Sequence, residues 1–163
     1  MVLDLCAGVG AIGLEAVSRG AREVVFVELN GRIASILEFN VTELGCGDRA
    51  TVVRADALGP AALAQAPRDC DLVFLDPPYP LWDDLATRER LIDLAARCRD
   101  NMKDESFLIL RTPEEVPEDF PGIPGFDGPA TPGVFSLAPP CALPRSSVGF
   151  PAILRVISGD PPW

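Results

Sequence analysis

Short apolar runs alternate with amphipathic stretches through the first two thirds of the chain. The apolar runs predict strands at 2–6, 24–28, 51–54, 71–76 and 106–111. The amphipathic stretches between them predict helices at about 11–19, 31–44, 59–66 and 84–100. Strands that alternate with helices in this way form a parallel sheet with crossover helices. We therefore expect an α/β fold with a doubly wound, mostly parallel sheet.

The last third of the chain has a different character. Residues 112–151 are rich in proline and glycine, which predicts a long irregular connection with a short strand near 133–137. A further strand, the last of the chain, is expected at 152–157. An irregular segment of this length is uncommon inside a compact domain.

Composition excludes several kinds of chemistry. The 163 residues contain no histidine, which rules out a Ser–His or Cys–His nucleophile pair. The five cysteines, at 6, 46, 70, 98 and 141, include no Cys-x-x-Cys pair, so we expect reduced thiols and no metal site. No apolar run has the length of a membrane span, and no basic segment followed by an apolar one resembles a signal peptide. We therefore expect a cytoplasmic protein without a membrane partner.

The segment Asp76-Pro77-Pro78-Tyr79 follows the apolar run at 72–75. Two prolines cannot continue a central strand, because neither can donate a hydrogen bond to the ladder. The strand must therefore stop at its carboxyl end, which is where open α/β sheets bind their ligands. The resulting rigid turn presents a carboxylate, backbone carbonyls and an aromatic face. These groups suit a planar ring that carries an exocyclic amine.

A glycine-rich turn lies between the first predicted strand and the first helix. Gly8 and Gly10 let the backbone approach a ligand closely, and Gly13 lets the helix pack tightly on the sheet. The same Gly-x-Gly-x-x-Gly spacing is also found in dinucleotide sites. Asp4, inside the first strand, separates the two interpretations, since an acid there favours a cationic or amine-bearing ligand over a pyrophosphate.

These motifs together carry a resemblance to a known family. Segments 4–10, 26–28, 54–58 and 76–79 resemble successive motifs of class I S-adenosylmethionine-dependent methyltransferases. More narrowly, residues 2–21 are similar to RsmD-type enzymes, which methylate the N2 amine of a guanine in small-subunit (16S) ribosomal RNA. The similarity covers residues 1–111 well, and after Thr112 only Arg145-x-x-Val148-Gly149 is similar to the family. It implies a single methyltransferase domain over 1–163, with seven strands of which the last is antiparallel.

The resemblance also implies a set of site residues. S-adenosyl-L-methionine would be the methyl donor, with no metal. Its expected binding residues are Asp4, Ala7, Gly8, Gly10, Glu28, Asp56 and Ala57. Glu28 would accept hydrogen bonds from the ribose hydroxyls, and Asp56 with Ala57 would contact the adenine. The expected catalytic residues, which hold the methyl acceptor, are Asp76, Pro77, Pro78 and Tyr79.

Each of these assignments has a purely structural alternative. Asp4 could instead cap the glycine loop, Glu28 could be an exposed carboxylate at a strand end, and Asp56 could cap the following helix. Tyr79 could pack within its loop. Trp82 is equally suited to stacking on a base or to anchoring the loop.

The expected partner is ribosomal RNA or the small ribosomal subunit, bound by a monomer. A net charge of −10 is the opposite of an RNA binder's, and the arginines at 88, 90, 97 and 99 could form either a phosphate-binding or a solvated helix face. Family members carry a basic segment before the first strand, which here begins directly after Met1. We expect a misassigned start, a fragment or a shortened relative. The alternative functions are an N6-adenine DNA methyltransferase, a small-molecule or protein methyltransferase, and a truncated non-catalytic remnant.

Overall fold

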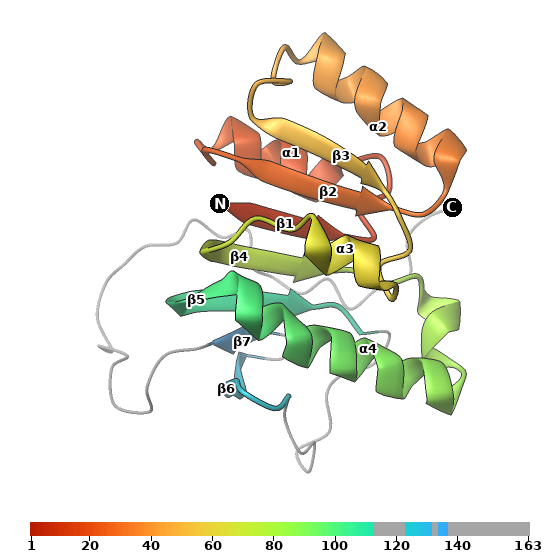
Figure 1. Ribbon diagram of the computed structural model, residues 1–163, viewed down its shortest axis with the longest axis vertical. Helices are drawn as coiled ribbons and strands as arrows, with labels where there is room; N and C mark the ends of the chain where they lie inside the picture. Colours follow the sequence, from red (N-terminus) through yellow and green to blue (C-terminus); the bar gives the residue numbers. More distant parts are fainter. Residues whose placement is uncertain (113–122, 132–133, 137–163) are drawn as a thin grey trace.

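The computed structural model describes residues 1–112, 123–131 and 134–136. The strands of this part form one seven-stranded sheet in the order β3-β2-β1-β4-β5-β7-β6 (Figure 1). Their bounds are β1 (Val2–Leu5), β2 (Val24–Glu28), β3 (Ala50–Arg54), β4 (Cys70–Leu75), β5 (Met102–Leu110), β6 (Asp127–Thr131) and β7 (Val134–Ser136). The α/β fold expected from the sequence is therefore confirmed.

Helices connect the parallel strands as the alternating pattern predicts. They are α1 (Ala11–Ser18), α2 (Gly31–Glu43), α3 (Pro60–Ala64) and α4 (Leu85–Cys98), with short 3₁₀ helices η1 (Tyr79–Trp82) and η2 (Arg99–Asn101). Most predicted ends lie within two residues of the observed ones. The exception is β5, which begins four residues earlier than expected because Met102 pairs with Cys70 ahead of a register shift.

The direction of the strands separates two parts of the sheet. Strands β1 to β5 are all parallel, and β1 lies between β2 and β4. Strand β7 confirms the short strand expected near 133–137, and it is antiparallel to both β5 and β6. Strand β6 was not expected. The strand expected at 152–157 lies outside the described residues, so the antiparallel direction of that final strand stays a prediction.

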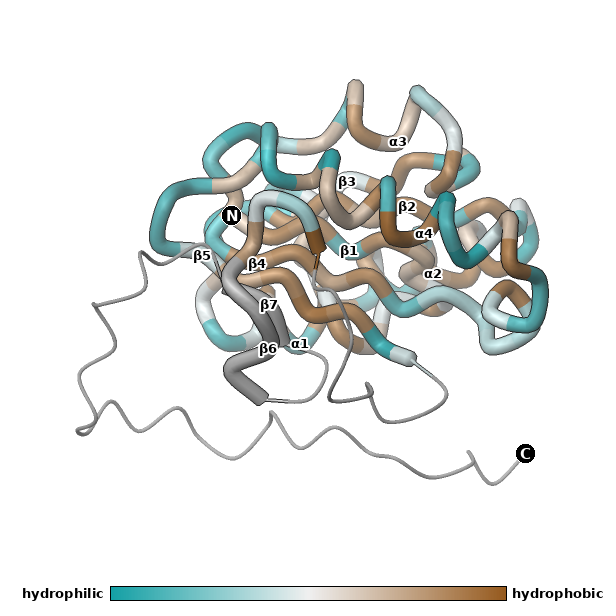
Figure 2. Tube along the Cα trace, turned by 90° about the horizontal axis from the view of Figure 1, so that it is seen from below, coloured by the Kyte–Doolittle hydropathy of each residue, from teal (hydrophilic) through white to brown (hydrophobic). Residues whose placement is uncertain are grey.

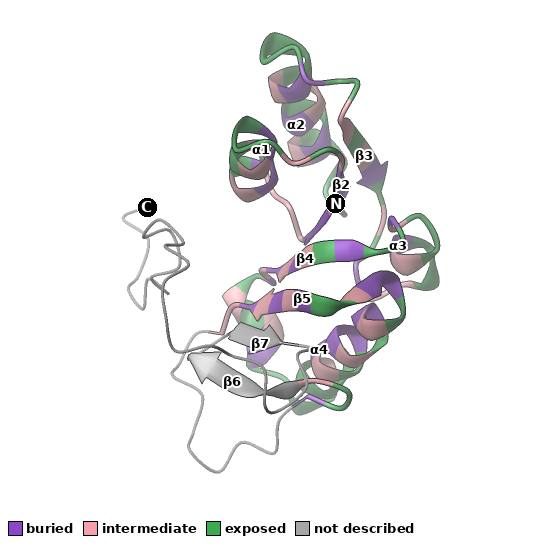
Figure 3. Ribbon diagram, turned by 90° about the vertical axis from the view of Figure 1, so that its left-hand side faces the viewer, coloured by how far each residue is buried: buried purple, intermediate pink, exposed green. Residues whose placement is uncertain are grey.

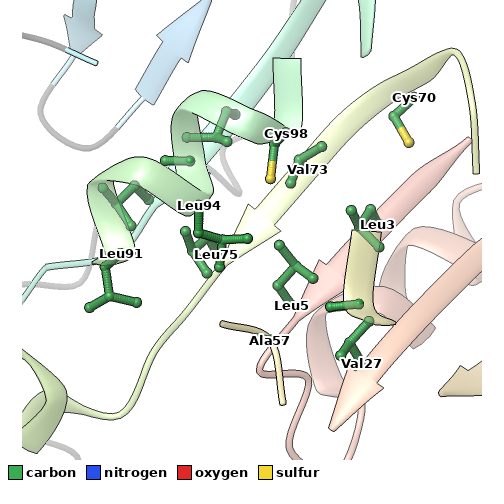
Figure 4. Close-up of a cluster of buried hydrophobic side chains, with 14 of the residues drawn as sticks. Leu3, Leu5, Val27, Ala57, Cys70, Val73, Leu75, Leu91, Leu94 and Cys98 are labelled. Atoms are coloured by element: carbon green, nitrogen blue, oxygen red, sulfur yellow. The ribbon is translucent and has the colours of Figure 1, made fainter. Parts of the chain in front are cut away.

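Two hydrophobic clusters cover the two faces of the sheet. Alternation along β1 sends Leu3 and Leu5 to the face covered by α3 and α4, where they meet the buried face of α4 (Figure 4). Val2 belongs to the cluster on the other face, formed with α1 and α2. The hydrophobic residues follow the central strands (Figure 2), and burial is concentrated on the strands and on the inward faces of the helices (Figure 3). Such a three-layer arrangement is a doubly wound sheet.

The amino ends of the parallel strands carry a small ion-pair network. The carboxylate of Asp71, at the start of β4, pairs with the amino terminus of Met1 and with the ammonium of Lys103 in β5. Lys103 is the only lysine of the sequence. These contacts hold the pKa of Asp71 below its ordinary value, mainly through the hydrogen bond from Lys103. This edge of the sheet thus has its charges paired locally.

Across the described ranges, no helix combines the length and hydropathy needed to cross a bilayer. The cysteines of the described residues are free thiols, of which Cys46, Cys70 and Cys98 are buried and Cys6 is partly buried. Cys141 lies outside the described part of the chain. Burial raises the pKa of the Cys98 thiol to about 12, so this thiol is unreactive at neutral pH.

Candidate active site

The glycine loop joins β1 to α1 at the carboxyl edge of the sheet. Gly8 and Gly10 have φ angles of +57° and +88°, in the left-handed region that favours glycine. A Cβ at Gly8 would have no atom within 4 Å, so the loop is open at this residue. A Cβ at Gly10 would lie 2.2 Å from Cδ1 of Leu37 in α2. The left-handed φ and the packing against α2 thus both disfavour a side chain at Gly10, and its expected contact with the cofactor stays a prediction.

Gly13 has the packing role predicted for it. A Cβ at this position would lie 2.2 Å from the Phe26 ring and 2.9 Å from Oδ2 of Asp4. The backbone N–H of Gly13 donates a 3.0 Å hydrogen bond to the same Asp4 oxygen. Asp4 is only 1% exposed, and burial raises its pKa to about 7 against the lowering effect of the Gly13 hydrogen bond. The charges of Asp76 and Glu28 raise the pKa of Asp4 further.

Glu28 ends β2 and connects two loops. Its carboxylate accepts hydrogen bonds from the backbone N–H of Gly8 at 2.9 Å and of Asn30 at 2.7 Å. Asn30 in turn caps α2, with its side-chain oxygen accepting from the backbone of Arg32 and Ile33. Glu28 is 9% exposed, which rules out the alternative of an exposed carboxylate at a strand end. The acid and the glycine loop therefore form one unit.

Asp56 and Ala57 follow β3 at the same edge. The Asp56 carboxylate accepts a 3.0 Å hydrogen bond from the backbone N–H of Leu58, and Gly59 is the N-cap residue of α3. Asp56 is exposed, so its side chain is accessible to a ligand. Ala57 is buried in the cluster under α3 and α4, and any ligand contact at this position would have to come from its backbone.

The turn after β4 is as abrupt as its sequence predicts. The backbone N–H of Asp76 donates to Leu5 of β1, and the helix η1 begins three residues later at Tyr79. Pro77 is buried and Pro78 is exposed. The carbonyl of Pro78 accepts from the N–H of Leu81, which fixes the turn.

Four carboxylates at this edge influence the ionisation of the Cys6 thiol. Burial raises the pKa of the Cys6 thiol to about 12, and the negative charges of Glu28, Asp76, Asp4 and Asp56 raise it in the same direction. These acids come from four adjacent strands, so they give a negative potential around Cys6, to which Asp4 contributes fully only above its pKa of about 7. Such a potential favours a cationic ligand and disfavours a pyrophosphate. Within the described residues, no group of three or more acids or cysteines is arranged to hold a metal ion.

Comparison with known proteins identifies the family. Residues 1–121 match the model of the family described as conserved hypothetical protein 95. The chain belongs to this family. The ribosomal RNA small subunit methyltransferase D of Haemophilus influenzae is 35% identical over 117 residues, which are 71% of this chain and 58% of that enzyme. The Escherichia coli K12 enzyme of the same name is 32% identical over 124 residues, 75% of this chain and 57% of the relative.

Solved structures agree with this assignment. The yhhF protein of Escherichia coli has a TM-score of 0.61 at 29% identity, and the match covers 83% of this chain and 72% of that one. The resemblance to RsmD-type class I methyltransferases is thus confirmed. The chain spans less than two thirds of the length of the two curated relatives.

Arg111 is a residue of this RsmD-like site that no sequence motif indicated. It follows β5 directly, and its backbone N–H donates to Leu75 of β4. Its Nη1 donates a 3.0 Å hydrogen bond to Oδ2 of Asp76, and its guanidinium carbon lies 5.7 Å from the centroid of the Tyr79 ring. Partial burial works to lower the pKa of Arg111, but Asp76 and Tyr79 together raise it above its ordinary value.

Trp82 and the candidate arginines of α4 and η2 make contacts within the chain. Trp82 is 6% exposed, and its carbonyl accepts from the guanidinium of Arg88, so it anchors the loop. Arg97 pairs with Asp93 on its own helix, and Arg99 pairs with Asp104. Three of the four candidate arginines thereby make contacts within the chain, and a phosphate-binding role of this face stays a prediction.

Proposed function

We propose that this chain transfers a methyl group from S-adenosyl-L-methionine to the N2 amine of a guanine in small-subunit ribosomal RNA. One observation carries the proposal. The rigid turn that begins at Asp76 and the open glycine loop at Gly8 leave the carboxyl ends of adjacent strands, β4 and β1. A methyl donor and a methyl acceptor bound at this edge would therefore lie side by side.

The residues at this edge fit the methyl donor. The negative potential around Cys6 suits a ligand that carries a sulfonium and an ammonium group. When bound, S-adenosyl-L-methionine supplies a methyl group activated by a positively charged sulfur. We assign its binding to Asp4, Ala7, Gly8, Gly10, Glu28, Asp56 and Ala57.

Glu28 can hold a ribose without losing its present contacts. Each of its two oxygens accepts one backbone hydrogen bond, and a carboxylate oxygen has two lone pairs. One acceptor site thus remains on each oxygen for the two neighbouring ribose hydroxyls. Asp56 would accept from the adenine amine, and the backbone of Ala57 would contact the ring.

Asp76 holds the methyl acceptor in this proposal. An aromatic amine is a poor nucleophile because its lone pair is delocalised into the ring. Hydrogen bonds from the amine to Asp76 and to the Pro77 carbonyl would favour a pyramidal nitrogen and stabilise its developing positive charge. Alignment of the two reactants can supply roughly 7–11 kcal/mol of the barrier. Stacking on Tyr79, worth about 1–3 kcal/mol, would partly offset removal of the base from its stack.

A small-molecule or protein methyltransferase is the second candidate. It is favoured by the net charge of −10 and by the basic side chains that are already paired with acids of the same chain. RNA binding requires Lys and Arg side chains that neutralise phosphates. We therefore expect this chain alone to bind RNA weakly and to methylate it slowly.

The test combines titration and product analysis. Isothermal titration should show binding of S-adenosylmethionine and none of NAD. The chain is then incubated with labelled methyl donor and one substrate at a time: small ribosomal subunits, free ribosomal RNA or duplex DNA. The nucleosides of each reaction are analysed by mass spectrometry. We expect N2-methylguanosine from ribosomal RNA. N6-methyladenosine, or cofactor binding without any nucleoside product, would overturn the proposed substrate, and absence of cofactor binding would favour a non-catalytic remnant.

A further inference from the structure

Arg111 contacts both side chains that the proposed function assigns to the methyl acceptor. It donates to Oδ2 of Asp76 at 3.0 Å, and its guanidinium lies over the ring of Tyr79. The three residues come from two neighbouring strand ends and a 3₁₀ helix, and Arg111 is 35 residues away from Asp76 in sequence. One side chain thus connects the carboxylate and the aromatic ring of the acceptor turn.

The geometry leaves distinct surfaces for the base. The carboxylate of Asp76 has two oxygens, of which Oδ2 is engaged by Arg111, so Oδ1 can accept from the target amine. The guanidinium of Arg111 over one face of the Tyr79 ring is attracted electrostatically by the π electrons of that ring. In the proposed function the base would stack on the face of Tyr79 that Arg111 does not cover. The side chains of Arg111 and Asp76 are 38% and 24% exposed, so the ion pair is accessible to water.

We propose that Arg111 is a positioning residue, which holds the Asp76 carboxylate and the Tyr79 ring in the arrangement that receives the methyl acceptor. This inference rests on the proposed function and deepens it. Arg111 acts through its two neighbours and does not itself touch the reacting atoms. Its planar fork suits this task, because the guanidinium can donate to a carboxylate and lie over a ring with the same set of atoms.

Kinetics of matched variants test the role. Arg111→Gln removes the charge, Arg111→Lys keeps it without the planar fork, and Arg22→Gln, at an exposed arginine just before β2 on the opposite edge of the sheet, is the control. For Arg111→Gln we expect kcat for methylation of small ribosomal subunits to fall by about 10- to 100-fold, as misplacement of reacting groups does. Affinity for S-adenosylmethionine should stay within about twofold, since Arg111 contacts the acceptor turn only. Arg111→Lys should recover part of kcat, and Arg22→Gln should leave it unchanged.

A second readout does not depend on activity. The sequence contains one tyrosine, so ring-labelled tyrosine gives NMR signals of Tyr79 alone. These signals should shift in Arg111→Gln and in Asp76→Asn, and stay in place in Arg22→Gln. Unshifted Tyr79 signals in a folded Arg111→Gln protein would overturn the positioning role. So would an unchanged or increased kcat, which would mean that Arg111 is dispensable or blocks Asp76.

The two proposals fail differently. If wild-type protein binds S-adenosylmethionine but methylates no ribosomal RNA, the proposed function is wrong, while the Tyr79 signals still decide whether Arg111 holds the turn. If the wild type is active and Arg111→Gln equals it in kcat, only the inference about Arg111 is wrong.

Discussion

The carboxyl edge of the sheet has a proposed cofactor side, with Asp4, Glu28 and Asp56, and a proposed acceptor side, with Asp76 and Tyr79, and different kinds of hydrogen-bond partner hold the two sides. On the cofactor side, the carboxylates accept hydrogen bonds from main-chain amides: Gly13 donates to Asp4, Gly8 and Asn30 donate to Glu28, and Leu58 donates to Asp56. On the acceptor side, Asp76 accepts from the side chain of Arg111. Main-chain donors persist through most substitutions, whereas a side-chain donor disappears with one. A single substitution should therefore disturb the arrangement of the acceptor side more easily than that of the cofactor side.

The largest expected effect is on the acceptor side. Asp76→Asn should lower kcat for methyl transfer by about 10²–10³-fold, the loss typical of removing a group that stabilises transition-state charge. Affinity for S-adenosylmethionine should hardly change, because our proposal places Asp76 against the methyl acceptor and not against the cofactor. Asp83→Asn, at an exposed acid of the same loop, is the control. A tenfold loss of cofactor affinity in Asp76→Asn would show that the two sides are not separable.

The next effect concerns the buried acid of the cofactor side. Asp4 keeps its proton to about pH 7 in the folded chain, while the unfolded chain loses it near 3.8. Between these values the folded state binds more protons, so the free energy of unfolding falls as pH rises, and it levels off above 7. A difference of about three units between the pKa values of Asp4 in the folded and unfolded chain corresponds to about 4 kcal/mol of unfolding free energy. Urea unfolding from pH 4 to 8 should show this fall in the wild type and lack it in Asp4→Asn.

A parallel pH slope in the two proteins would mean that Asp4 is ionised in the folded chain. In that case the acid of β1 would be a permanent anion, and the cofactor side would hold more negative charge at neutral pH than its burial indicates.

A smaller effect, on the free energy of unfolding, is expected at Gly13, whose backbone N–H donates to Asp4. Gly13→Ala places a methyl group against Phe26 and Asp4, and overpacking of this kind costs about 2–3 kcal/mol of unfolding free energy. Gly31→Ala is the matched control, since a Cβ there meets no atom within 4 Å. Chemical denaturation of both variants measures the difference. Equal stability would show that α1 can shift away from the sheet at no cost.

The smallest of these effects is on cofactor affinity. Glu28→Gln removes the charge that accepts two backbone hydrogen bonds and, in our proposal, two ribose hydroxyls. Affinity for S-adenosylmethionine should fall by about tenfold, or about 1.5 kcal/mol. Titration calorimetry on this variant and on Glu43→Gln, an exposed acid at the end of α2, measures it. If both variants bind equally well, Glu28 serves the loop alone.

Local sequence patterns predicted most of the fold, including the glycine loop after β1 and the abrupt turn after β4. The apolar run before Asp76 and the two prolines after it act through neighbouring residues, so their effect is visible in the sequence. The pairing of Arg111 with Asp76 depends on the register of β5 against β4, which no local pattern specifies. The same holds for Gly10, whose constraint comes from Leu37 in a different helix.

The predicted start of β5 was wrong because the prediction used hydropathy alone. The charged residues Asp104 and Glu105 interrupt the apolar pattern, so the sequence predicts a strand only from 106 onward. In the structure both side chains are exposed, and Met102, two residues before them, already pairs with Cys70. A strand end can extend over charged residues when its side chains reach solvent. Hydropathy alone therefore underestimates its length.

The single lysine of the sequence has a practical consequence for surface chemistry. The side-chain amine of Lys103 lies beside Asp71, at the start of the parallel strands. Asp76 follows the opposite end of β4. A label or support directed to lysine side chains would therefore attach to this chain at one position remote from the candidate site, and the carboxyl edge of the sheet would stay accessible.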